Sequence, residues 1–142
     1  MTRRLIAKRE RVVRARRVQH LLASVETARA QNEALSLEDN AQRVRLVRAE
    51  LFATDEVTSG AQLAAHRELA GRLEQAGRQL DGAIYDAQKR VEQREVELRL
   101  ANRDKEIAER LKEKAARALA EQMEARLQSL SRHKRSALLG DI

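Results

Sequence analysis

The residues best suited to catalysis or metal binding are too few and too scattered in this sequence to form a site. His20, His66 and His133 lie far apart, and no His-x-x-x-His pair offers zinc two ligands on one helix face. The absence of cysteine excludes disulfides, cysteine-ligated zinc and thiol catalysis. No Gly-x-x-x-x-Gly-Lys-Ser/Thr loop is present to hold a phosphate. We therefore expect no enzyme, no metal site, no cofactor and no small-molecule substrate.

Basic side chains are the chemically distinctive feature, and they concentrate near both ends of the chain. The formal net charge is +7, with 29 lysines and arginines. Because close-packed like charges repel one another, such clusters indicate a partner that carries negative charge. The first cluster comprises Arg3, Arg4, Lys8, Arg9, Arg11, Arg14, Arg16 and Arg17, and the second comprises Lys112, Lys114, Arg117, Arg126, Arg132, Lys134 and Arg135.

The composition favours long helices over a compact fold. Charged residues make up 36% of the chain, aromatic residues 1%, and proline is absent. Few large side chains leave little apolar area for a many-layered core, and the bias toward Ala, Glu, Arg and Leu is typical of a coiled coil. No apolar run approaches the roughly 18 residues of a membrane span, and the apolar part of the basic start is too short for a secretory signal. A mitochondrial transit peptide is the less favoured interpretation of that start.

A seven-residue apolar repeat between residues 63 and 108 predicts one helix of a coiled coil. Two sets of positions alternate in steps of three and four, which is the a/d pattern of side chains that meet a partner helix. Because so narrow an apolar stripe cannot bury itself, a second helix must pack against it. One set is Leu63, Ala70, Gly77, Ile84, Val91 and Leu98, and the other is His66, Leu73, Leu80, Ala87, Arg94, Ala101 and Ala108.

The stretch 4–53 contains no glycine and no proline and is also predicted to be helical. Its apolar residues recur in steps of three and four, which places them on one side of a helix. The phase shifts at 36–40, which we interpret as a stutter in one continuous helix. A helix break capped by Ser36 and Asp39 is the alternative. The predicted stripe comprises Leu5, Val12, Ala15, Val18, Leu22, Val25, Ala28 and Leu35, followed by Leu37, Ala41, Val44, Val47 and Leu51.

Residues 54–60 interrupt the pattern and predict a turn. Ser59 followed by Gln62 is a capping box, so the second helix should begin near Gly60. A short connection between two amphipathic helices makes them antiparallel neighbours. The predicted fold is therefore all-α, an antiparallel two-helix coiled-coil hairpin that forms a single domain over residues 1–142. Its parts are a helix over 4–53, the turn, a helix over 60–133 and a frayed tail over 134–142.

The second helix is predicted to extend beyond the first. At 1.5 Å per residue the two helices would be about 75 Å and about 110 Å long. Folding the chain about residue 56 places residue 5 beside residue 107, so roughly the last two dozen residues of the second helix have no partner in the chain. An unpaired apolar stripe on a helix predicts a binding protein there. In this region the stripe is expected to drift in register through Leu111, Ala115, Ala118, Met123, Leu127 and Leu130.

Taken with the basic first helix and the turn, two stretches of the second helix resemble the FliJ family of flagellar export proteins, which is related to the YscO-type stalks of type III secretion. The first stretch is Leu69-x-x-x-Leu73-x-x-Ala76-x-x-x-Leu80. The second runs from Val91 through Lys105-Glu-Ile-Ala-Glu-Arg-Leu-Lys-Glu-Lys-Ala into Glu121-Gln-Met-Glu. The resemblance implies a non-catalytic stalk whose joined termini enter the ring of the hexameric export ATPase and promote its assembly and activity.

The resemblance also implies partners and contact sites. The flank of the stalk would contact the cytoplasmic domain of the export gate, and export chaperones would be a further partner. The protein would then be cytoplasmic and peripherally associated with the inner face of the cell membrane. The implied gate contacts are Leu69, Leu73, Ala76 and Leu80, although Leu73 and Leu80 also belong to the coiled-coil stripe. The implied ATPase-ring contacts are Arg3, Arg4, Arg9, Arg11, Arg14, Lys112, Lys114, Arg117 and Arg126.

Two other functions compete with the stalk. A basic coiled coil could grip nucleic-acid phosphates with both clusters, and its affinity would then fall steeply with salt. The shortage of aromatic residues to stack on bases argues against nucleic acid. The third hypothesis is a self-associating structural protein, in which the unpaired end of the second helix forms a four-helix bundle with a second copy.

Overall fold

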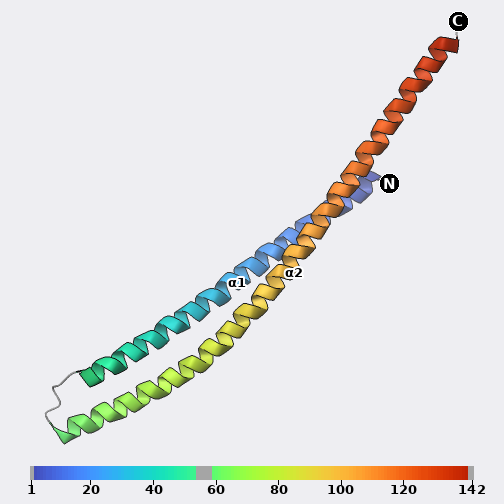
Figure 1. Cartoon of the computed structure of the whole chain (residues 1–142). Coiled ribbons are helices and arrows are strands. Elements are labelled where there is room, and N and C mark those ends of the chain that lie inside the picture. The colour runs from blue at the N-terminus through green and yellow to red at the C-terminus, as the bar shows by residue number, and fades with distance from the viewer. Residues whose placement is uncertain (1, 54–58, 141–142) are drawn as a thin grey trace. The chain divides into compact units, whose positions relative to one another are not determined.

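The predicted fold class is confirmed. The computed structural model describes residues 2–53 and 59–140, together with the side chains of residues 3–53, 59–132 and 134. The chain forms two helices, α1 (Thr2–Ala53) and α2 (Gly60–Gly140), which pack against each other (Figure 1). No strand occurs within the described ranges. The protein is thus an all-α two-helix hairpin.

The helix ends agree with the capping signals in the sequence. The Ser59 side-chain oxygen accepts a hydrogen bond from the Gln62 backbone N–H (3.3 Å), and the Ser59 carbonyl accepts one from the Leu63 N–H (3.2 Å). The first bond caps a donor that a helix start leaves free, and the second is the first regular hydrogen bond of α2, so Ser59 is the N-cap residue. Most of the predicted turn, residues 54–58, lies outside the described residues. The helix α2 is described up to Gly140, and the expectation that 134–142 frays stays a prediction.

The chain divides into two compact units, each built from a part of both helices. The terminal unit comprises Met1–Leu22 and Arg99–Ile142, and the hairpin unit comprises Ala23–Leu98. The prediction of a single domain stays a prediction. Each unit is a helix pair with its own packing and its own charge.

In the hairpin unit, cross-helix contacts show that the two helices run antiparallel. Arg48 pairs with Glu74 (3.7 Å) and Arg45 with Asp81 (3.3 Å), so the partner number rises as the α1 number falls. Thr27 is buried, with 5% of its surface exposed. Its hydroxyl lies 2.8 Å from the Ala23 carbonyl in α1 and 3.2 Å from the Arg94 carbonyl in α2. One buried hydroxyl thus links the two backbones and fixes their register.

The heptad register predicted for α2 is the one the structure uses. All the predicted positions are buried or half-buried except Leu63 and Arg94. The register drift predicted after residue 108 is wrong, because the same heptads continue through half-buried Lys112, buried Ala115 and half-buried Leu119. Gly77 lies in the stripe, but a Cβ there would meet no atom within 4 Å. A close approach of the two backbones therefore does not require this glycine.

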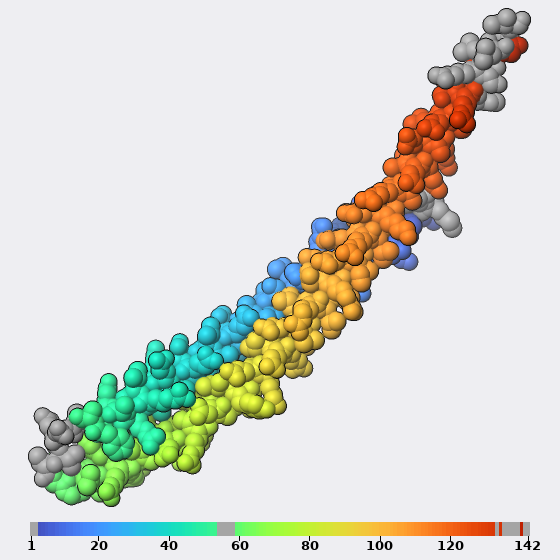
Figure 2. Space-filling view, viewed as in Figure 1, coloured from blue at the N-terminus to red at the C-terminus, as the bar shows by residue number. Residues whose placement is uncertain are grey.

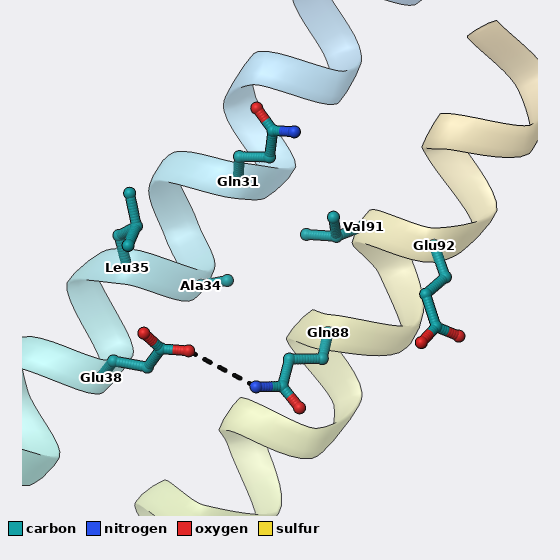
Figure 3. Close-up of a pocket in the computed structure, with 7 residues that line it drawn as sticks. All are labelled: Gln31, Ala34, Leu35, Glu38, Gln88, Val91 and Glu92. Atoms are coloured by element: carbon teal, nitrogen blue, oxygen red, sulfur yellow. Dashed lines mark hydrogen bonds between the residues drawn. The ribbon is translucent and has the colours of Figure 1, made fainter. Parts of the chain in front are cut away.

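The stripe predicted for the first part of α1 is wrong, because the true contact face is rotated away from it. Most of the large residues in that stripe are exposed, and Val13, next to Val12, is the one that is buried. Figure 3 shows the same offset further along: Ala34 points toward Val91 of α2, whereas Leu35 points away. The contact face has Ile6, Val13, His20, Thr27, Ala34, Ala41 and Arg48 at one heptad position and Arg9, Arg16, Ala23, Ala30, Leu37, Val44 and Leu51 at the other.

The stutter predicted at 36–40 is also absent. The two sets of contact positions keep strict seven-residue spacing along all of α1, and α1 is one unbroken helix. The minority alternative, a helix break, is likewise wrong. A constant 3.5-residue apolar period on both helices is the condition for a regular left-handed supercoil.

Candidate functional site: the cationic terminal unit

The two units carry opposite net charge. The terminal unit has 19 basic and 8 acidic residues, a net charge of +11, whereas the hairpin unit has 10 basic and 14 acidic residues, a net charge of −4. The formal charge of +7 therefore understates how cationic the terminal unit is. A field of this strength attracts anionic surfaces and raises their rate of encounter.

All nine of the predicted ring-contact residues lie in the terminal unit. Seven of them are exposed, while Arg9 and Lys112 are half-buried at heptad contact positions. Lys114 and Arg117 share a hollow of about 490 Å³ on the outer flank of α2, where Glu113 and Glu121 also line the wall. The exposed members are Arg3, Arg4, Arg11, Arg14, Lys114, Arg117 and Arg126.

Cations also occupy the contact face between the two helices of the terminal unit. Half-buried Arg9, Arg16 and His20 of α1 and Lys105 and Lys112 of α2 hold contact positions that are mostly apolar in the hairpin unit. Two ion pairs compensate in part, Arg16 with Asp104 (3.5 Å) and Arg17 with Glu109 (3.2 Å). Exposed pairs of this kind contribute only about 0–1 kcal/mol each. The helix pair in the terminal unit is therefore held mainly by a few apolar side chains, above all Val13.

No described residue packs against the end of α2 as a partner helix. Every described side chain from Ala120 to Arg132 is exposed, and Figure 2 shows the red part of α2 with no second helix against it. Met123, Leu127 and Leu130 lie in this stretch, spaced by four and three residues, and all are exposed. We call residues 120–132 the unpaired end. The unpaired end agrees with the sequence prediction that α2 extends beyond α1.

The stretch of α2 that pairs with α1 lies about ten residues further toward the C-terminus than predicted. The pairs Arg16–Asp104 and Arg17–Glu109 place residue 5 opposite about residue 118, not residue 107. The pairing is centred near residue 61, midway between Arg48 and Glu74, rather than at residue 56, and the first residues of α2, 60–65, are all exposed. The unpaired end consequently begins near Ala120.

The four residues implied as gate contacts lie in the hairpin unit and differ in accessibility. Leu69 is exposed, whereas Leu73, Ala76 and Leu80 are half-buried. Leu73 lines a hollow of about 220 Å³ together with Gly77, Arg45 and Glu74. Arg45 forms an ion pair with Asp81, and Glu74 forms one with Arg48. Three of the four therefore contribute to helix packing, and Leu69 alone among them is well presented to a partner.

In the described part of the chain, no three His, Cys, Asp or Glu side chains lie closely enough together to hold a metal ion. Neither helix, over its described length, has an apolar stretch suited to crossing a membrane. The features that the sequence did not reveal are the division of charge between two units and the buried hydroxyl of Thr27.

Fold and site together define a class of protein, a two-helix hairpin with a cationic terminal unit and an unpaired helix end. Comparisons with known proteins add no relative: no protein-family model, no curated protein and no solved structure matches this chain. The function is therefore argued from the geometry and from the resemblance of its sequence motifs.

Proposed function

We propose that this chain is the non-catalytic coiled-coil stalk of a flagellar or type III protein export apparatus. In this role the terminal unit inserts into the ring of the hexameric export ATPase and promotes ring assembly and activity. The flank of the hairpin unit, with Leu69 exposed on it, contacts the cytoplasmic domain of the export gate. The protein acts in the cytoplasm, bound peripherally to the inner face of the membrane through the apparatus.

One observation supports this proposal above the others: the net charge of +11 lies in the same unit as the unpaired end of α2. The unpaired end bears exposed Met123 and Leu127 and is itself neutral, with two glutamates and two arginines, and it adjoins paired helices rich in exposed cations. Such an arrangement is suited to insertion into a protein socket with an acidic rim. An enclosing ring would cover apolar side chains that are otherwise left in water. A nucleic-acid groove would use the cations and leave those apolar side chains unburied.

The proposal is tested by measuring the activity of the cognate export ATPase with and without this protein at near-physiological salt. We expect a rise in ATPase rate together with ring formation in sedimentation. A chain that ends after Leu119 keeps the paired helices and removes the unpaired end, so it should not stimulate. Arg126→Glu should weaken stimulation, whereas Arg67→Glu, an exposed change in the hairpin unit, should not.

The same preparation separates the alternatives. No stimulation and no co-sedimentation with the ATPase would refute the stalk. Binding to a DNA duplex of random sequence at physiological salt, with log Kd rising steeply with log salt concentration, would then favour a nucleic-acid function. A molar mass that rises with concentration in the absence of any partner would favour self-association.

A further inference from the structure

The outer face of α1 in the terminal unit carries an apolar patch that no described residue covers. Val18, Leu21 and Leu22 are 56%, 64% and 60% exposed. Their spacing of i, i+3 and i+4 brings them together on one side of the helix. That side is opposite the contact face, because the neighbouring contact positions Arg16 and His20 are half-buried against α2. We call Val18, Leu21 and Leu22 the outer patch.

Cations continue the outer patch toward the N-terminus along the same side of α1. Arg14 precedes Val18 by four residues and Arg11 precedes it by seven, so both lie on the outer face. Both are exposed, and neither makes an ion pair with any described residue. Glu10 is the one carboxylate between residues 3 and 22. Two free guanidinium groups therefore follow the apolar patch along one helix.

We infer that the outer patch, with Arg11 and Arg14, binds an acidic amphipathic α-helix of another protein. A ridge of apolar side chains spaced by three and four packs into the groove of a second helix. Carboxylates on that helix would complement Arg11 and Arg14, since guanidinium and carboxylate groups form charge-assisted hydrogen bonds. Arg11 and Arg14 are also among the implied ring contacts, so the acidic helix would bind the chain while its terminal unit is outside the ring. The test below uses the free chain, so its outcome does not depend on the proposed function.

Two other partners, a second copy of this chain and a lipid surface, fit the outer patch less well. The net charge of +11 on the terminal unit opposes pairing of this face with the same face of a second copy. A lipid surface is disfavoured because the patch has no Trp or Phe to anchor at the headgroup level. An acidic amphipathic helix would bury the outer patch and place carboxylates beside Arg11 and Arg14.

The test uses fluorescence anisotropy with a labelled synthetic peptide and the full chain at about 0.15 M salt. The peptide is about 18 residues long, with leucines spaced by three and four and glutamates at most other positions. Two companion peptides replace every leucine with glutamine or every glutamate with lysine. We expect binding of the acidic leucine peptide, at least about tenfold weaker binding of the glutamine peptide, and no binding of the lysine peptide.

Protein variants locate the site. The double change Leu21→Gln and Leu22→Gln should weaken binding of the acidic leucine peptide at least about tenfold, and the fold should persist because both side chains are exposed. Leu46→Gln is the matched control, since Leu46 is 57% exposed in the hairpin unit, and it should leave binding unchanged. Circular dichroism of each variant checks that the helices are intact.

Several outcomes would overturn the inference. Equal affinity for the leucine and glutamine peptides would mean that charge alone is responsible. Unchanged binding in the Leu21/Leu22 variant would place the site elsewhere. The inference also fails if that variant lowers the molar mass of the free chain or abolishes flotation with anionic lipid vesicles while leaving peptide binding unchanged. The outer patch would then serve a second copy or a membrane.

Discussion

Replacing Val13 or its neighbour Val12 by alanine measures which face of α1 meets α2. Val13 is 1% exposed and Val12 is 38% exposed. Val13→Ala removes about two methylene equivalents from a closed site, a loss of about 1.6 kcal/mol plus a cavity term. Alanine is a better helix former than valine by about 0.5 kcal/mol, which both variants gain. We expect Val13→Ala to destabilise by about 1–2 kcal/mol and Val12→Ala to change stability by less than about 0.5 kcal/mol.

The assay is urea unfolding followed by circular dichroism of the helical signal, with hydrogen exchange of α1 amides as a local readout. Exchange is added because it reports the opening of the terminal unit separately from that of the hairpin unit. The two variants share the same chemistry and the same propensity gain, so their difference isolates burial. Equal destabilisation, or a larger effect of Val12→Ala, would show that the contact face of α1 is assigned wrongly.

Three further predictions concern the cap, the α2 contact face and the charge of the terminal unit. Ser59→Ala should cost about 1 kcal/mol of unfolding free energy by removing the helix cap, whereas Ser129→Ala, in mid-helix, should cost nothing measurable in the same urea titration. Ile84→Asp should lower helicity and melting temperature because it places an unpaired charge in the contact face, and unchanged thermal melts would contradict the heptad register; exposed Tyr85→Asp is its control. Raising salt from about 0.05 to 0.5 M should slow hydrogen exchange in the terminal unit, where cations crowd the contact face, more than in the hairpin unit; the opposite ranking would mean that repulsion does not limit its stability.

The register of α2 could be predicted because, between residues 73 and 91, its contact positions hold most of the large apolar residues. Leu73, Leu80, Ile84 and Val91 recur at heptad spacing, and few residues of similar size lie on the other faces near them. Hydropathy and contact therefore coincide on this helix. The cap at Ser59 could also be predicted from the sequence, since a capping box depends on residue types three positions apart.

The register of α1 was missed because its largest apolar residues face outward. Leu21 and Leu22 dominate any hydropathy pattern, whereas the contact face consists of small residues such as Thr27, Ala30 and Ala34. A signal was nevertheless present: Ala23, Ala30, Leu37, Val44 and Leu51 recur every seven residues without a shift. Had this strict seven-residue period been given more weight than side-chain size, it would have predicted the correct contact face of α1 without a stutter.

The basic clusters of the candidate site could be counted from the sequence, but their assembly could not be deduced in full. Which residues share a unit depends on where the helices overlap, and the sequence placed that overlap about ten residues away from its position in the structure. Arg9 and Lys112 are half-buried because of the same register, so their burial could not be predicted from the sequence either.

The position of the Ser59 cap beside the turn implies an order of folding. Contacts near the turn close short loops: Arg45 and Asp81 are 36 residues apart in sequence. Thr27 and Arg94 are 67 apart, and Arg17 and Glu109 are 92 apart. Closing the longest of these loops from an open chain costs about 0.8 kcal/mol more than closing the shortest. The chain should therefore zip from the capped turn toward its termini, so that the cationic end is the last part to form and the first to open.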